Sequence, residues 1–99
     1  MSAHLPTGVA PYKRTPTFTE ATVPAGLLHD HSTKEGTWGL IHVEERRLRY
    51  LVTYPARPSE EAILEPDAPP GVVEPLILHR VEPRGAVRFH VEFLRRPGD

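Results

Sequence analysis

Apolar and polar residues alternate over several short runs of the chain. The clearest run is residues 48–54, in which every second residue is Leu, Tyr or Val. Because the side chains of a strand project alternately to its two faces, this run predicts a β-strand with one apolar face. Residues 37–43 form a similar run, and the charged residues 44–47 between the two predict a turn. The two runs are therefore expected to form an antiparallel hairpin.

A second hairpin is expected in the last quarter of the chain. Residues 76–81 and 86–94 are rich in apolar residues and have the length of strands. The segment Pro83-Arg84-Gly85 between them contains residue types that commonly reverse the chain.

The rest of the chain is broken by many prolines and glycines. Residues 15–23 and 25–31 are further strand candidates, and residues 60–65 predict either a helical turn or a short strand. The twelve prolines and seven glycines are spread along the whole length, so long helices are not expected. Short strands bounded by turn residues are typical of an all-β sandwich or barrel, and we expect one such domain over residues 1–99.

The charge balance narrows the classes of function. The chain has 12 Lys and Arg against 13 Asp and Glu, and the two signs are interleaved in residues 44–49. A nucleic-acid binder needs clustered cations to neutralise phosphates, so no nucleic-acid partner is expected. No run approaches the ~20 apolar residues of a membrane span, and the N-terminus has no leader pattern. We therefore expect a cytoplasmic protein with no membrane partner.

Histidine and carboxylate are the side chains to consider for a metal site, because the chain has no cysteine. His29 and His31 are two residues apart and are followed by Glu35. In an extended strand both imidazoles would point to one face. The string resembles the start of the first metal-binding motif of cupins. Two surface histidines beside a turn would show the same spacing.

His79 stands among apolar residues of its expected strand. If the turn at residues 83–85 is tight, His79 lies opposite residues near His90 across the hairpin, with Glu92 next along that face. Two imidazoles and a carboxylate would then meet at one point. A core histidine whose hydrogen bond is satisfied by Glu92 or by a backbone carbonyl is the alternative. Trp38 would either line a ligand cavity or belong to the core.

Seven segments of the chain carry a resemblance to a known family. They are residues 12–19, 23–28, 31–39, 48–50, 73–75, 79–83 and 87–93. In these segments the chain resembles the TehB/YeaR-like small cupin-type domains, which occur alone or fused to tellurite-resistance methyltransferases. The resemblance covers nearly the whole length and implies a cupin-like β-sandwich or barrel.

The resemblance also implies a set of site residues. His31 is similar to the histidine of the family's His-x-x-Lys segment, and His79 to that of its His-x-Val-Glu segment. Glu92 matches an acidic position. We therefore expect a divalent metal held by His31, His79 and Glu92, in a reduced set because the second cupin motif is only partly present. Further candidate site residues are Lys34, Glu35, Trp38, Glu82 and His90.

Three functions are compatible with these residues. The first is a stress-response protein that binds a divalent metal, zinc, without demonstrable catalysis. The resemblance associates such domains with tellurite resistance and with the response to nitrate and nitrite. The second is a small metalloenzyme that uses Fe, Ni or Mn. The third is a metal-free barrel that binds a small molecule or an oxyanion. A homodimer, which would cover the edges of a small sheet, is a further expectation.

Overall fold

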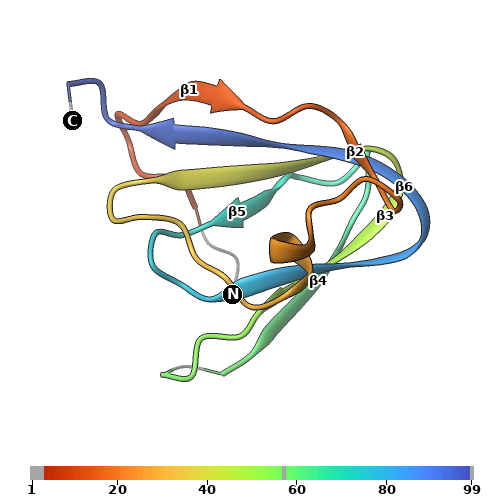
Figure 1. Ribbon diagram of the computed structural model, residues 1–99. Helices are drawn as coiled ribbons and strands as arrows, with labels where there is room; N and C mark the ends of the chain where they lie inside the picture. Colours follow the sequence, from red (N-terminus) through yellow and green to blue (C-terminus); the bar gives the residue numbers. More distant parts are fainter. Residues whose placement is uncertain (1–3, 57, 99) are drawn as a thin grey trace.

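Two long antiparallel strands form the frame of the molecule. The computed structural model describes residues 4–56 and 58–98. Within them, β3 (Trp38–Val52) pairs with β6 (His79–Arg95) over almost all of its length. The two strands follow each other through the molecule in Figure 1, β3 in yellow to green and β6 in blue.

The paired strands are strongly bent. Register shifts against β6 occur in β3 between Val43 and Glu45 and between Arg46 and Leu48. Arg46 has a φ of 69°, and Gly85 in β6 has a φ of 128°. Bulges of this kind increase the twist and bend of a strand. In Figure 1 both strands turn back at the right-hand side, so the ribbon folds over and its two halves enclose the core.

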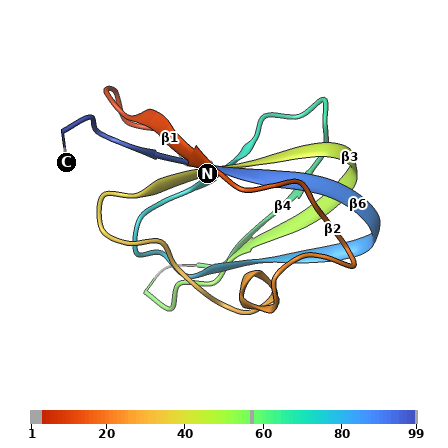
Figure 2. The same cartoon turned by 45° about the horizontal axis from the view of Figure 1, so that its top comes forward.

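The other strands extend this ribbon on both sides. β1 (Ala10–Arg14) and β2 (Phe18–Thr19) pair with β6, whereas β4 (Glu60–Leu64) and β5 (Gly71–Val73) pair with β3. All these pairings are antiparallel. A short 3-10 turn, η1 (Ala25–Leu28), lies beside β6 at the margin of the folded ribbon (Figure 2). The expected all-β fold of the small-barrel, cupin-like class is confirmed.

Alternating residues of the two long strands form the hydrophobic core. Ile41 and Val43 come from one half of β3, and Leu48 and Tyr50 come from the other half. Phe89 of β6 belongs to the same cluster and is fully buried. Burying a side chain of this size contributes roughly 1.5–3 kcal/mol. The core therefore holds the two halves of the folded ribbon together.

Most of the residues expected as strands in 37–43, 48–54, 76–81 and 86–94 lie in β3 and β6, but the expected hairpin pairing is wrong. Residues 44–47 and 83–85 are not turns, because they lie inside β3 and β6 at the bend. Residues 38–43 pair with the second half of β6, and residues 48–52 with its first half. An exposed bulge and a hairpin turn favour the same residues, namely polar side chains, proline and glycine. The local sequence pattern therefore cannot distinguish a bulge from a hairpin turn. Which of the two forms depends on the strand that pairs with these residues.

The first third of the chain is less regular than expected. Residues 15–23 contribute only the two residues of β2, and residues 25–31 contain η1 instead of a strand. Pro24 precedes η1 with a φ of -60°, a value that proline imposes and that suits the start of a helical turn. Of the two alternatives for residues 60–65, the strand is confirmed. No helix in the described part of the chain is long and apolar enough to cross a membrane.

Candidate functional site

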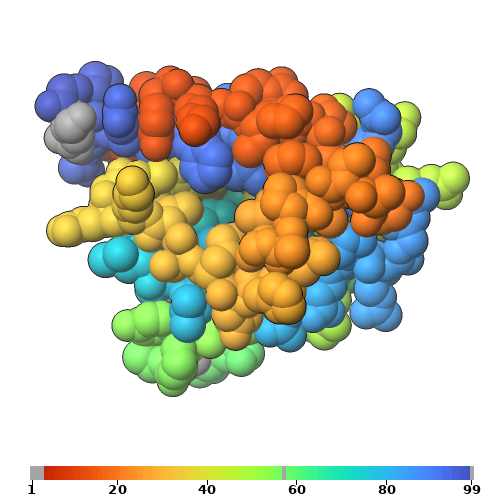
Figure 3. Space-filling model, in the orientation of Figure 1, coloured from red at the N-terminus to blue at the C-terminus, as the bar shows by residue number. Residues whose placement is uncertain are grey.

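A cavity of about 480 Å³ opens on the interior side of β3, β5 and β6. In Figure 3 a recess lies between the red β1 segment, the orange segment around η1 and the yellow loop that follows, with teal β5 at its floor. The cavity has an apolar lining, formed by Phe18, Leu27, Ile41, Val73, Val81, Phe89, Val91 and Phe93. Small-molecule sites usually have volumes of roughly 300–1,000 Å³ and such a lining. The cavity is therefore large enough for a small ligand.

Two histidines form the main polar feature of the cavity wall. The amide N–H of His31 donates to the carbonyl of His79 at 2.9 Å, and the amide of His79 donates to the carbonyl of His31 at 2.9 Å. This reciprocal pair holds the two residues directly opposite each other, with their side chains on the same face. The ring centroids are 4.1 Å apart, and both rings line the cavity.

The hydrogen bonds of the two rings fix their tautomers. Nδ1 of His31 lies 2.8 Å from the carbonyl oxygen of His29, and Nδ1 of His79 lies 3.0 Å from that of Ile77. A carbonyl oxygen only accepts, so each Nδ1 carries the proton and donates it. In the neutral rings each Nε2 therefore keeps its lone pair. Within the described residues neither Nε2 has a hydrogen-bond partner, and neither is sealed from solvent, so both open into the cavity.

His79 is held in the neutral form. Its side chain is almost fully buried, with 4% of its surface exposed, and Tyr50 packs edge-on against it at 5.9 Å. Burial disfavours the charged imidazolium and lowers the pKa of His79 to about 4. The ring is consequently an acceptor, and a metal ligand if an ion is present, over the whole physiological pH range.

An ion pair anchors the segment that carries His31. Arg80 donates from Nη1 to Oδ1 of Asp30 at 2.9 Å, which holds the pKa of this carboxyl below its usual value. Arg80 also donates from Nε to Glu82, which in turn accepts from Arg49. The charged network thus ties the residue before His31 to the residue after His79. It anchors the two segments on one side of the histidine pair.

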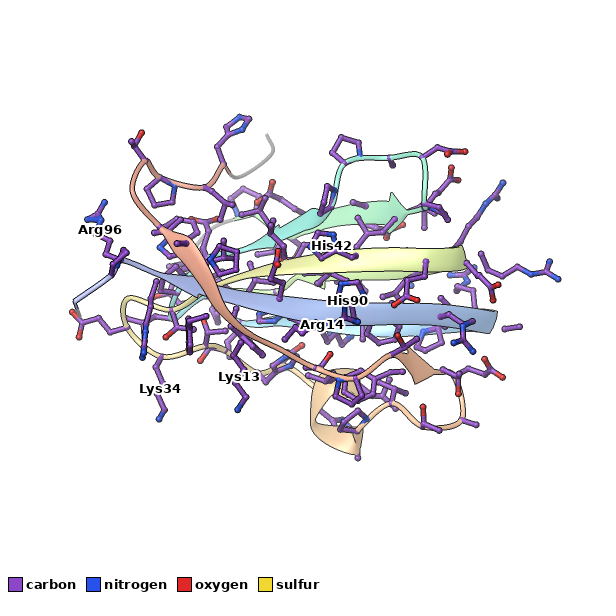
Figure 4. All side chains as sticks on the ribbon, turned by 90° about the horizontal axis from the view of Figure 1, so that it is seen from above. Lys13, Arg14, Lys34, His42, His90 and Arg96 are labelled. Atoms are coloured by element: carbon purple, nitrogen blue, oxygen red, sulfur yellow. The ribbon has the colours of Figure 1, made fainter. Side chains whose placement is uncertain are left out.

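Lysine side chains stand at the opening of the cavity. Lys13 from β1 and Lys34 from the loop after His31 both line it, and both are exposed. Figure 4 shows the two side chains projecting to the same side of the sheet. None of the described carboxylates lines the cavity. The opening is therefore positively charged, whereas the interior is apolar.

Glu92 and His90 lie on the opposite face of the sheet. His90 is paired with His42 and not with His79, so the expected juxtaposition of His79 and His90 is wrong. The rings of His42 and His90 stack at 4.8 Å, as Figure 4 shows above the sheet. Nε2 of His42 lies 3.2 Å from Oε1 of Glu92. Successive residues of a strand face opposite sides, and the even-numbered pair 90 and 92 points away from the cavity.

The other expected site residues do not join the histidine pair either. Glu82 belongs to the charged network, Glu35 is exposed in the loop after Lys34, and Trp38 is half-buried at the start of β3. Over residues 4–56 and 58–98 no group of three or more His, Asp and Glu side chains has the arrangement of a metal site. Of the expected metal ligands, the structure brings together His31 and His79 alone.

Lys13 was missed by the analysis of the sequence. A signal for it exists, because the chain has only two lysines, Lys13 and Lys34, against ten arginines. The apolar lining contributed by η1 and β2 was also missed, since these residues were expected to form a longer strand. Only the folded chain brings them to the cavity, because β2 pairs with β6 and η1 lies beside β6.

Comparisons with known proteins agree with the family resemblance. A family model described as TehB-like domain matches residues 13–91. Two proteins described as probable S-adenosyl-L-methionine-dependent methyltransferase TehB, from two strains of Haemophilus influenzae, are 36% and 35% identical over 72 residues. Each match covers 72% of this chain and 25% of the relative. The chain thus spans about a quarter of the length of these relatives.

Two solved structures share the fold. The crystal structure of TehB from Haemophilus influenzae matches 91% of this chain and 32% of its own, with a TM-score of 0.82 and 27% identity. A crystal structure of a protein from E. coli strain K12 matches 96% of this chain and 98% of its own, with a TM-score of 0.83 and 22% identity. At this lower identity the likeness shows the fold alone.

Proposed function

Because the chain belongs to the TehB-like domain family, we propose that it is a small-ligand-binding domain whose cavity is centred on the His31–His79 pair. One observation carries the proposal. Two imidazoles whose Nδ1 protons are already used face an apolar cavity with two free Nε2 acceptors. Unpaired acceptors in an apolar wall favour a ligand that brings a hydrogen-bond donor with an apolar body. No catalytic step is part of the proposal.

A pair of isomeric probes tests this function. n-Octanol and heptyl methyl ether have the same size, but only the alcohol donates a hydrogen bond. We expect both to shift the NMR signals of the cavity residues, with the alcohol binding about fivefold more tightly, which corresponds to one hydrogen bond of about 1 kcal/mol. The double variant His31→Phe/His79→Phe keeps both aromatic rings but removes both acceptors, and it should abolish the preference, whereas His79→Phe alone should reduce it.

Two results would overturn the proposal. One is that neither probe shifts the signals of the cavity residues. The other is that the ether binds wild-type protein as tightly as the alcohol does. His29→Phe serves as the matched control, because the His29 side chain is exposed and does not line the cavity.

Metal binding is a second candidate function. It is supported by the bonds from Nδ1 to backbone carbonyls, because metal-ligating histidines usually donate their other ring N–H in this way. His31 and His79 would hold the ion, zinc being the first candidate and Fe, Ni or Mn the alternatives. Two imidazoles fill only part of a zinc coordination shell. The bound ligand would therefore have to supply the remaining donors, and the ion would act as a Lewis acid toward it.

The metal content of the purified protein distinguishes metal binding from metal-free ligand binding. Protein purified without a histidine tag would be analysed by elemental mass spectrometry, beside His31→Ala and His79→Ala. Near-stoichiometric metal that is lost in both variants supports the site. Absence of metal from wild-type protein, with a melting temperature unmoved by added Zn, Fe, Ni or Mn, rejects it and leaves the ligand-binding proposal intact.

The family resemblance suggests the setting of this binding. It associates such domains with tellurite resistance and with the response to nitrate and nitrite. We propose that the domain serves a stress response of this kind by holding a small ligand in the cavity.

A further inference from the structure

Both lysines of the chain belong to the lining of one cavity. Lys13 and Lys34 are 21 positions apart in the sequence and come from different segments, yet both line the same cavity. All ten other basic residues are arginines. Figure 4 shows the two lysine side chains projecting to the same side of the sheet.

Neither lysine is neutralised by the described chain. Residues 4–56 and 58–98 supply no carboxylate to either ammonium group, whereas Arg49 and Arg80 each have two acidic partners. The cavity lining contains no described Asp or Glu that would compensate the two charges. Two uncompensated cations beside a low-dielectric wall create a positive potential at the opening. An anion at this position would be stabilised.

The wall behind the lysines is unsuited to a bare inorganic ion. Phe18, Phe89 and Phe93 belong to the lining, together with the aliphatic residues named above. Filling this space with an apolar group removes apolar surface from water and is favourable at roughly 25 cal/mol per Å². A ligand that uses both parts of the cavity needs an apolar body and a negative end.

We propose that the ligand of this cavity is an amphipathic organic anion that also carries a hydrogen-bond donor for the His31–His79 pair, such as a medium-chain hydroxycarboxylate. Its apolar body lies against the phenylalanines, and its charged group lies between Lys13 and Lys34. This inference rests on the proposed ligand-binding function and adds the chemical class of the ligand. Both ammonium groups donate charge-assisted hydrogen bonds to the anion.

A matched pair of probes tests the charge requirement. Octanoate and n-octanol have the same chain, and calorimetric titration gives the affinity of each. We expect octanoate to bind wild-type protein at least roughly tenfold more tightly than n-octanol, as for a hydrogen bond to a charged group. Raising NaCl from about 0.05 to 0.5 M should weaken octanoate and leave n-octanol unchanged, because salt screens exposed charges.

Lysine variants test which positive charges attract the anion. Lys13→Met and Lys34→Met are each expected to weaken octanoate roughly fivefold without affecting n-octanol, and the double variant should no longer bind octanoate more tightly than n-octanol. Arg96→Met is the control. It removes one positive charge at an exposed residue that does not line the cavity, and it should leave both affinities unchanged.

The outcomes separate this inference from the function on which it rests. If n-octanol binds wild-type protein as tightly as octanoate does, the inference is wrong and the ligand-binding function stands. If sodium sulfate binds as tightly as octanoate, the lysines form an inorganic oxyanion site and the inference is again wrong. If neither octanoate nor n-octanol binds, the proposed function itself fails.

Discussion

At the scale of the single residue, burial decides the protonation state of His79. The flanking residues Leu78 and Arg80 do not account for the lowered pKa of His79, because burial is its largest cause. The fold places the ring between His31 and Tyr50, where only 4% of the residue is exposed and water solvates an imidazolium poorly. The pKa therefore falls to about 4, and the residue becomes a permanent acceptor.

This low pKa predicts a loss of stability in mild acid. The unfolded chain takes up a proton below the ordinary pKa of 6.5, whereas folded protein takes it up only near pH 4. The contribution of neutral His79 is thus fully present above pH 6.5 and is lost as the pH falls toward 4. Urea denaturation in EDTA should show a decrease of about 2–3 kcal/mol in the free energy of unfolding between pH 7.5 and 4.5.

The carboxylates lose their contributions to stability at lower pH than His79 does. The two losses can therefore be measured separately. A hydrogen bond from His90 lowers the pKa of Glu44 from its usual 4.5, so its contribution is lost only below that pH. His79→Gln should flatten the decrease above pH 4.5, whereas His29→Gln should leave it unchanged. An NMR titration that gives His79 a pKa near 6.5 in the folded protein would contradict the explanation.

Single positions with unusual backbone conformations decide the shape of the elements. β6 continues through Pro83-Arg84-Gly85 because Gly85 adopts a φ of 128°, which side chains disfavour. The bend there lies opposite the bulged part of β3. Gly85 and the bulges of β3 together therefore bend the two-stranded ribbon.

Replacing this glycine tests the bend. A Cβ at Gly85 would meet no atom within 4 Å, so any cost of Gly85→Ala is conformational. We expect a loss of about 1–3 kcal/mol in the free energy of unfolding. Gly26→Ala is the matched control, because its Cβ also meets nothing within 4 Å and its φ is not positive. That change should be neutral or slightly stabilising. Equal effects of the two changes would argue against the bend.

The fold of the whole molecule determines which histidines and carboxylates lie close enough to share a site. The folded ribbon has an inner face, which carries His79, and an outer face, which carries His42, His90 and Glu92. The two faces are separated by the sheet itself. Residues that are close in the pattern of the sequence can therefore belong to different sites.

The separation of the faces predicts the effect of changing Glu92. Because Glu92 contacts His42 and not the cavity, Glu92→Gln should leave n-octanol and zinc binding within about 0.5 kcal/mol, roughly twofold, of wild-type values. His79→Gln should reduce both. The measurements are the NMR and elemental analyses described above. A loss of metal in Glu92→Gln as large as in His79→Gln would restore Glu92 as a ligand.

The sequence by itself determined the class of the fold and part of the site. Alternation in residues 48–54, together with prolines that exclude long helices, is a local property, so an all-β fold could be predicted without any knowledge of the partner strands. The apolar neighbours of His79 likewise indicated that it is buried. These features survive in the structure because side-chain period and backbone restrictions act within a few residues.

Only the tertiary structure decided the pairing and the composition of the cavity. Residues 44–47 and 83–85 read equally well as turns or as bulges, and the choice depends on the strand opposite. That choice sets which face Glu92 occupies and brings His31 to His79. It also brings Lys13 to the cavity that Lys34 lines. Contacts between distant segments depend on how the whole core packs, and no local pattern encodes them.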